Sequence, residues 1–313
     1  MDQNLLLCGG LLVTAILLAY VALHAWTPPP IVEHASEKNY RSRSSPKSAK
    51  PLPSLHDIAS IDITVVIPAY NETARLPSML DTAVTYLAAQ KGRTYEILIV
   101  DDGSSDGTAD KALAMAKGYP RADIRVVQLE KNLGKGGAVR HGMLHGRGEK
   151  LLMVDADGAS RFEDLALLWN ALDGIGRKGV AIGSRAHLVK TAAVVKRSFI
   201  RNFLMYGLHT VLRIVGVGHI RDTQCGFKLF TRAAAQQIFP NQHLTTWIFD
   251  VELLLLAKQL GIPVEEVPIE WHEVPGSKLN VMKDSLQMLR DLLVLRANML
   301  LGRWKIGLKA KAE

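Results

Sequence analysis

Apolar segments of two kinds interrupt the polar stretches of the chain. The first kind occurs once, at residues 5–26, and carries no formally charged side chain. At about 1.5 Å per helical residue, this run is long enough to cross a hydrocarbon core of roughly 30 Å. Asp2 is the only charged side chain before it, and the run is longer than the apolar core of an ordinary signal peptide. We therefore expect an N-terminal tail at 1–4 and a transmembrane anchor at 5–26, rather than a cleaved signal peptide.

The second kind of apolar segment is shorter, rich in β-branched residues and repeated. These runs are typical of buried strands, and helical stretches separate them, the first at about 76–90. The alternation predicts an α/β fold with a doubly wound sheet and flanking helices. We place the catalytic domain at 60–280, with one half at 60–185 and the other at 186–280. The expected strands are 61–68, 95–100, 124–129 and 150–157.

The segment 27–59, between the anchor and the first strand, is rich in Pro, Ser and Lys and shows no apolar periodicity. It predicts a linker or a partly ordered strap. Positive charges follow the anchor and none precedes it, so the positive-inside rule places the bulk of the protein in the cytosol. The cations that follow the anchor are Lys38, Arg41, Arg43, Lys47 and Lys50.

Acidic side chains stand at the carboxyl ends of two expected strands. In α/β sheets, ligands bind outside these strand ends. Asp101 and Asp102 would accept hydrogen bonds from a base and from ribose hydroxyls. Asp155 and Asp157 occupy alternate positions of an extended segment and would hold Mg²⁺ or Mn²⁺ against a diphosphate. The alternative for this D-x-D sequence is a solvated turn.

A glycine-rich run at 134–137 follows the third expected strand. It lacks the spacing of a P-loop, so the phosphate-binding loop of P-loop NTPases is excluded. Gly134 and its neighbours would let the backbone approach a ligand closely, with Lys135 near the phosphates or the base. A plain strand-to-helix turn remains the alternative.

The composition and net charge of the chain narrow the classes of partner that we expect it to bind. The net charge of +8 and the pI near 9.4 suit an anionic partner, and the chain contains no recognised nucleic-acid module. A membrane surface and a phosphorylated substrate are therefore expected, and nucleic acid is not. Cys8 and Cys225 are far apart in the sequence, which favours a reducing compartment over a disulfide framework.

Two later segments mix apolar residues with cations, at 199–217 and 281–305. Both predict helices that lie in the membrane interface, with cations at the lipid phosphates and apolar side chains in the acyl layer. Ordinary core packing is the alternative for each. We assign 281–313 to a membrane-interfacial C-terminal region. The sequence leaves the oligomeric state open.

The motifs together resemble glycosyltransferase family 2, which has the GT-A fold, a Rossmann-like mixed sheet. The first-half motifs are VVIPAYNE at 65–72, VDDGSSDGT at 100–108, NLGKG at 132–136 and DAD at 155–157. Within the family, the second half resembles the dolichyl-phosphate β-glucosyltransferases. The motifs there are DTQCGFKLF at 222–230, FDVELL at 249–254 and VPGSKL at 274–279.

This resemblance implies transfer of glucose from UDP-glucose to dolichyl phosphate at the endoplasmic reticulum membrane, for N-glycan precursor assembly. It implies Asp155 and Asp157 as metal ligands. Ala159 stands where mannosyl relatives often have a further ligand, and Thr246 stands where relatives commonly have Arg. The substrate contacts that it implies lie at Pro68, Tyr70, Glu72, Asp101, Asp102, Gly134, Lys135, Ala156, Arg197, Asp222 and Gln224.

A lipid monophosphate acceptor simplifies the expected chemistry. Its second pKa is about 6, so near pH 7 it is a nucleophile without a general base. We expect direct displacement with inversion, and cations that hold two phosphates together. Arg185 and Arg201 are the expected catalytic cations, with Arg197 next. Asp222 is the alternative base, or else a carboxylate that orients Arg221 or a backbone turn. A mannosyltransferase using GDP-mannose and a sugar-nucleotide pyrophosphorylase are the alternative enzymes.

Overall fold

The computed structural model describes residues 3–188, 218, 220–276 and 280–307. A nine-stranded sheet lies at its centre, in the order β2-β1-β5-β4-β3-β6-β8-β7-β9. The strands are β1 (Asn39–Ser42), β2 (Ser45–Pro51), β3 (Ile61–Ala69), β4 (Tyr95–Asp101), β5 (Asp123–Gln128), β6 (Gly148–Val154), β7 (Val180–Ser184), β8 (Phe227–Thr231) and β9 (Val264–Pro268).

Four neighbouring strands of this sheet, β5, β4, β3 and β6, run parallel. They are the four strands that the apolar runs predict, with ends that agree to within a few residues. β8 runs antiparallel between β6 and β7, so the sheet is mixed. Since β6 ends at Val154, Asp155 and Asp157 lie in the loop after the strand.

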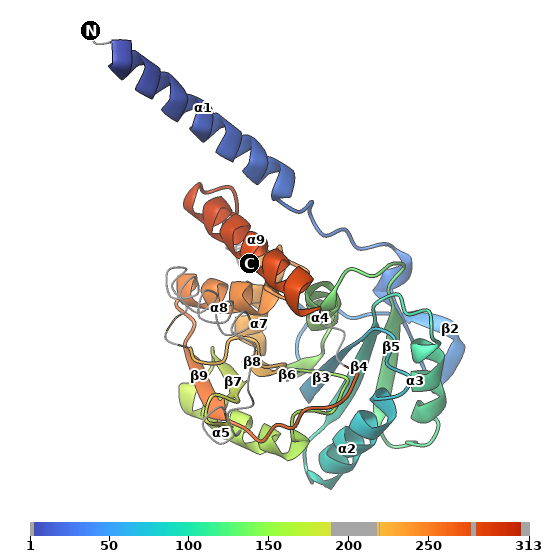
Figure 1. The fold of residues 1–313 in the computed structure, drawn as a ribbon. Helices are drawn as coiled ribbons and strands as arrows, with labels where there is room; N and C mark the ends of the chain where they lie inside the picture. The colour runs from blue at the N-terminus through green and yellow to red at the C-terminus, as the bar shows by residue number, and fades with distance from the viewer. Residues whose placement is uncertain (1–2, 189–217, 219, 277–279, 308–313) are drawn as a thin grey trace.

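Helices cover both faces of the sheet (Figure 1). Successive strand side chains point to opposite faces. Val65 of β3 therefore packs in one core with Leu80, and Val66 packs in the other with Met143. Short 3-10 turns lie at Ser36–Lys38, Phe162–Asp164 and Phe239–Asn241. The helices are α1 (Gln3–Trp26), α2 (Leu76–Ala89), α3 (Thr108–Ala116), α4 (Lys135–Leu144), α5 (Leu165–Ile175), α7 (Arg232–Ile238), α8 (Phe249–Gln259) and α9 (Val281–Leu300).

The strap, residues 27–59, is more ordered than a linker. It supplies β1 and β2, and β1 pairs antiparallel with β5. The buried carboxylate of Glu37 accepts hydrogen bonds from the backbone N–H groups of His34 and Glu130. Of the two expectations for this segment, a linker or a partly ordered strap, the strand pairing favours the strap. These strands are held by backbone hydrogen bonds and carry few apolar side chains, so an apolar pattern does not reveal them.

The end of the strap is tied to the domain by one buried guanidinium. Arg232, at the start of α7, donates hydrogen bonds to four backbone carbonyl groups. Two of these belong to the strap, one to the turn before β6 and one to the first residue of β6. The acceptors are the carbonyl oxygens of Ser54, Asp57, Gly146 and Gly148, at 2.7–3.2 Å.

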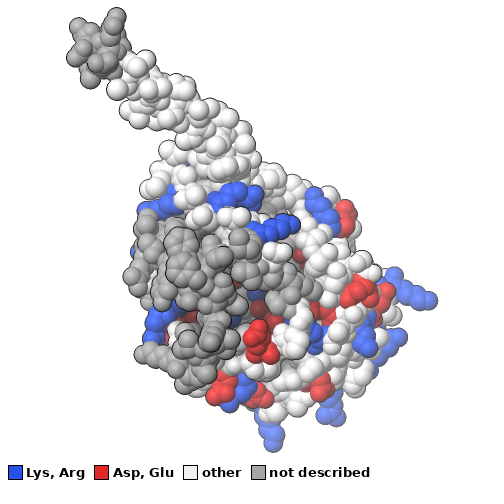
Figure 2. All heavy atoms as spheres, in the orientation of Figure 1, with Lys and Arg blue, Asp and Glu red and all other residues white. Residues whose placement is uncertain are grey.

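The helix α1 projects from the body of the protein (Figure 1). Its segment Leu7–Trp26 has a mean hydropathy of 2.1 and no buried residue, and it is long and apolar enough to span a membrane. Figure 2 shows uncharged atoms along this helix and Lys and Arg atoms where it meets the body. At its base, Asn298 of α9 donates a hydrogen bond to Thr27.

The helix α9 has two different faces. Leu292 and Leu295 are fully buried in the core, whereas Leu286, Leu289 and Leu293 are 40–62% exposed. The buried face agrees with the expectation of core packing, and the expectation of a membrane-interfacial helix stays a prediction for the exposed face. The other expected interfacial segment, 199–217, lies outside the described residues.

Replacing Arg232 by Met is expected to lower the free energy of unfolding by about 3 kcal/mol, because several buried carbonyl groups lose a charged donor. Denaturant unfolding of the full chain in detergent micelles, followed by tryptophan fluorescence, measures this. Arg43→Met is the matched control, since Arg43 donates to one exposed carbonyl group, and it is expected to change stability by less than about 1 kcal/mol. Equal effects of the two substitutions would contradict the role of Arg232.

Candidate active site

A cleft of about 800 Å³ opens at the carboxyl ends of β3, β4 and β6. The strand-end motifs expected to bind a nucleotide sugar meet there, as the parallel topology requires. Residues from the segment before α8, the loop after β9 and the helix α9 close the other side. The predicted site residues that line the cleft are Pro68, Tyr70, Glu72, Asp102, Gly134, Lys135, Asp155, Ala156 and Asp157.

The two aspartates of the D-x-D sequence face cations. Lys135 Nζ lies 2.6 Å from Asp155 Oδ1, and Arg75 Nη1 lies 3.9 Å from Asp157 Oδ2. Burial, and then the negative charge of Asp155, raise the pKa of Asp157. Asp157 Oδ1 also accepts a hydrogen bond from the Ala159 N–H. Two neighbouring carboxylates in one cleft form an oxygen donor set that fits a divalent cation.

Gly226 leaves the space that Asp155 occupies. A Cβ atom at this position would lie 2.0 Å from Asp155 Oδ2, a distance that no side chain tolerates. In addition, the Asp155 N–H donates to the Gly226 carbonyl oxygen at 3.2 Å. The glycine of the QCGFK sequence is therefore required by the packing of a site carboxylate.

A fully buried ion pair lies beneath this contact. Lys228 of β8 pairs with Asp250 of α8 and donates to the Cys225 carbonyl oxygen at 2.5 Å. Burial raises the pKa of Asp250, although the charges of Lys228 and Lys135 lower it. The pair joins the QCGFK and FDVELL sequences, whose roles the sequence alone does not reveal.

Asp102 holds the glycine-rich loop. Its carboxylate accepts hydrogen bonds from the N–H groups of Leu133 and Gly134, at 2.7 and 2.9 Å. Burial raises its pKa to about 7, even though these two N–H groups lower it. Gly134 has a positive φ of 91°, and a Cβ there would lie 2.7 Å from the Thr245 carbonyl oxygen. The loop is thus more than a generic turn, since its backbone fits between a strand end and the segment before α8.

Asp101, the other acid of this pair, does not line the cleft. It is fully buried, and its Oδ1 accepts a hydrogen bond from the Ser104 N–H at 3.3 Å. Of the two aspartates that the sequence offers for nucleoside binding, the structure brings Asp102 to the cleft.

Arg75 is a cleft residue that the sequence analysis missed. It forms an ion pair with Glu72, with Nε–Oε2 and Nη2–Oε1 distances of 2.8 and 2.5 Å, and it extends to Asp157. It therefore connects the end of β3 with the loop after β6. The sequence feature that could have indicated Arg75 is its position, three residues after Glu72 and at the start of α2.

Arg185 and Asp222 pair with each other beside the cleft. The guanidinium of Arg185 donates to both carboxylate oxygens, at 2.7 and 2.8 Å, and its backbone N–H donates as well. Burial raises the pKa of Asp222, but the hydrogen bonds and charge of Arg185 outweigh this, so the pKa is lowered. Arg185 also lies over the ring of Trp271, a cleft residue, at 5.2 Å.

This pairing favours an orienting role for Asp222 over the role of a base. Its partner is Arg185 and not the expected Arg221, whose Nε lies 3.8 Å from Glu266 Oε2. Gln224, the other described residue predicted in this region, is not among the residues that line the cleft. Gln224 contacts Met288 of α9, with an Nε2–Sδ distance of 3.8 Å. Arg197 and Arg201 lie outside the described residues.

The far wall of the cleft comes from the segment before α8 and from α9. Thr246 Oγ1 donates to Asp291 of α9 at 2.6 Å, so Thr246 links this segment to α9. Trp247 and, from α9, Lys283 and Gln287 also line the cleft. The sequence analysis assigned α9 to the membrane and missed this second role.

Comparison with known proteins agrees with this arrangement. Residues 64–239 match the model of glycosyl transferase family 2. The chain is 44% identical to a dolichyl-phosphate beta-glucosyltransferase of Saccharomyces cerevisiae, over 94% of this chain and 93% of the relative. It is 42% identical to the Homo sapiens enzyme of the same name, over 95% of this chain and 94% of the relative.

Solved structures show the same fold. Glucosyl-3-phosphoglycerate synthase from Mycobacterium tuberculosis, in complex with Mn²⁺, UDP-glucose and phosphoglyceric acid, superposes with a TM-score of 0.57 at 20% identity, covering 76% of this chain and 80% of that one. Its complex with UDP gives a TM-score of 0.54, covering 76% and 81%. The expected GT-A fold is thereby confirmed, and the chain belongs to glycosyltransferase family 2.

Proposed function

We propose that this protein transfers glucose from UDP-glucose to dolichyl phosphate, with inversion, and releases dolichyl β-D-glucosyl phosphate and UDP. The observation that carries the proposal is the match, at 42–48% identity over most of the chain, to enzymes named for this reaction. The cleft agrees with it, since it joins nucleotide-binding strand ends to a helix with exposed leucines. The matches favour glucose over mannose, and the family excludes a pyrophosphorylase.

The donor would lie along the strand ends. Pro68, Tyr70 and Asp102 line the part of the cleft suited to the nucleoside, and Asp155 and Asp157 the part suited to the diphosphate. Mg²⁺ or Mn²⁺ held by these two carboxylates would stabilise negative charge on the departing UDP. A related synthase binds Mn²⁺ with UDP-glucose. Lys135, now 2.6 Å from Asp155, is positioned to contact the diphosphate.

The acceptor phosphate supplies the nucleophile. One of its oxygens forms a bond to the anomeric carbon as the bond from that carbon to UDP breaks, so no proton has to be removed from a dianion. Asp222 fits this account because both its oxygens already accept hydrogen bonds from Arg185. We propose Arg185, together with Arg197 and Arg201 from the undescribed segment, as the cations that hold the acceptor phosphate.

The lipid chain would leave the cleft along α9. This helix contributes Lys283 and Gln287 to the cleft, exposes Leu286 and Leu293, and contacts the base of α1. A cation near the phosphate followed by leucines suits an anionic lipid at a membrane surface. We propose a single-pass protein of the endoplasmic reticulum membrane with its catalytic domain in the cytosol, because the strap carries the cations.

Purified full-length protein in detergent is expected to transfer sugar to dolichyl phosphate from UDP-glucose at least about 100-fold faster than from GDP-mannose. The assay extracts lipid-linked product and compares initial rates with Mn²⁺. The proton NMR spectrum of the lipid-linked product is expected to show the β-anomer of glucose. A preference for GDP-mannose would overturn the proposed donor.

Asp157→Asn is expected to reduce the rate of transfer by about 100-fold or more, since the metal site loses one of its two carboxylates. Chelation of divalent ions by EDTA should have a similar effect on the unmodified enzyme and be reversed by added Mn²⁺. Asp173→Asn is the matched control, because Asp173 is an exposed acid of α5 that pairs with Lys150. Full activity of Asp157→Asn with unchanged Mn²⁺ dependence would contradict the metal site.

The rate of transfer at low acceptor concentration is expected to rise with pH through about 6, where dolichyl phosphate loses its second proton. The rate rises with pH because the dianion of the acceptor phosphate is the nucleophile. A phosphonate analogue of the acceptor, with a higher second pKa, should move this rise to higher pH. A rise that stays at the same pH with both acceptors would instead identify an enzyme base. The same profile in Asp222→Asn provides the companion measurement.

A further inference from the structure

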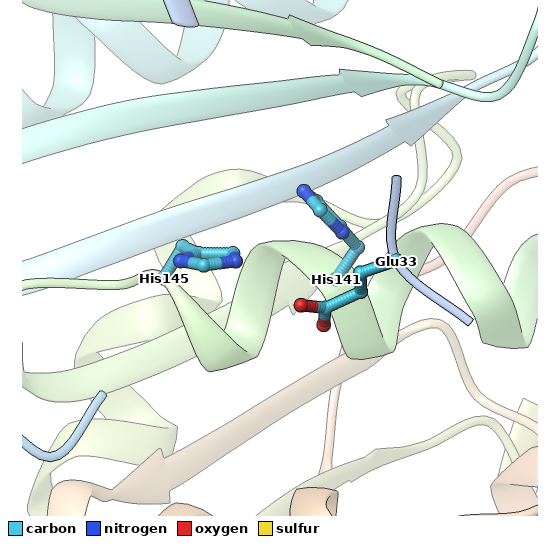
Figure 3. A group of neighbouring side chains, drawn as sticks. All are labelled: Glu33, His141 and His145. Atoms are coloured by element: carbon cyan, nitrogen blue, oxygen red, sulfur yellow. The ribbon is translucent and has the colours of Figure 1, made fainter. Parts of the chain in front are cut away.

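A second group of residues, of types that commonly bind metal ions, lies outside the lining of the cleft. It consists of Glu33 from the strap, His141 of α4 and His145, the residue that directly follows α4 (Figure 3). One ligand-type atom of each lies within 4.8 Å of the other two. Within the part of the chain that the structure describes, this is the sole group of three or more such residues. Two histidines four positions apart at the end of a helix present their rings on the same side.

Backbone carbonyl groups orient both imidazole rings. His141 Nε2 lies 2.9 Å from the Glu37 carbonyl oxygen, and His145 Nδ1 lies 2.6 Å from the Pro53 carbonyl oxygen. Because a carbonyl oxygen can only accept, the proton of each ring sits on the nitrogen that faces it. His141 Nδ1 and His145 Nε2 are then the ring nitrogens with a free lone pair. This is the outer-shell arrangement by which proteins orient metal-binding histidines.

The His145 ring nitrogen that faces no carbonyl group, Nε2, is an unpaired hydrogen-bond acceptor among the described residues. This nitrogen is also buried. Histidines that merely tie the strap to α4 would explain the two carbonyl contacts. They would leave a buried acceptor unpaired, which is unfavourable.

Glu33 supplies the negative charge. Its carboxylate is 23% exposed, and Arg140 Nη1 lies 3.6 Å from Oε1, a long contact for an ion pair. Figure 3 shows the Glu33 carboxylate and the His145 ring extending toward each other, with His141 beside them. Glu33 lies in a non-helical part of the strap, so its position can adjust.

We propose that Glu33, His141 and His145 bind a divalent transition-metal ion, Zn²⁺ in preference to Mg²⁺ or Mn²⁺. Two imidazole nitrogens and one carboxylate suit Zn²⁺, whereas Mg²⁺ and Mn²⁺ favour oxygen donors such as Asp155 and Asp157. Zinc bonds of about 2.1 Å place tetrahedral ligand atoms about 3.4 Å apart, so the group closes by about an ångström on binding. The ion would attach the strap to α4, the helix that begins at Lys135.

The test uses the full chain in detergent micelles. The parent protein carries both Asp155→Asn and Asp157→Asn, so that the two carboxylates of the cleft bind no metal ion. Co²⁺ is titrated as a spectroscopic substitute for zinc, and Zn²⁺ is then added in competition. The parent is expected to develop the visible absorption of nitrogen-ligated Co²⁺ at one equivalent, and Zn²⁺ is expected to abolish it. Glu33→Gln and His145→Gln should each weaken Co²⁺ and Zn²⁺ binding at least about tenfold.

His56→Gln is the matched control, because His56 is an exposed strap histidine outside the group, and it should bind as the parent does. Zn²⁺ should also raise the melting temperature of the parent and not that of Glu33→Gln. If His145→Gln does not fold, Glu33→Gln in the strap carries the comparison alone. The proposal is overturned if the parent binds no stoichiometric Co²⁺ or Zn²⁺, or if Glu33→Gln binds both ions as tightly as His56→Gln.

Discussion

The contact between the Asp155 carboxylate and the backbone of Gly226 is the constraint on which the cleft depends. It places an acid from the end of a parallel strand against the segment that leads into the antiparallel strand β8. Lys135 approaches the same carboxylate from the glycine-rich loop. Three segments distant in sequence therefore meet at one negative charge. Any side chain at 226 would push the acid out of this position, since the clash would be with the carboxylate itself.

The charged side chains around Asp155 are arranged so that its carboxylate stays available to a ligand. The buried pair of Lys228 and Asp250 fixes the backbone beneath Asp155, and burial makes such a pair costly to break. Arg75 approaches Asp157 only loosely, at 3.9 Å. A cleft with carboxylates and cations held in this way is already polarised before a ligand binds. This is the condition under which fixed charges stabilise a transition state without reorganisation.

Two peripheral elements connect the domain to the apolar helix α1. The strap extends the sheet through β1 and is held at its end by Arg232, so α1 joins the domain through ordered structure. The helix α9 divides its residues between the core, the cleft and solvent-exposed leucines. One helix thus reaches both the cleft and the base of α1. The acceptor proposed above, with a phosphate head and a long apolar chain, would contact both parts of this helix.

The sequence by itself determined the parallel strands, the apolar helix and the acidic strand ends. These features are local, since they depend on periodicity and on residue type at a strand end. Only the tertiary structure decided that Asp102 rather than Asp101 lines the cleft, that Arg185 is bound by Asp222, and that the strap forms strands. It also brought Glu33 close to His141 and His145. Each of these depends on contacts between distant segments, and a hydrogen bond or ion pair across such a distance leaves no periodic trace in the chain.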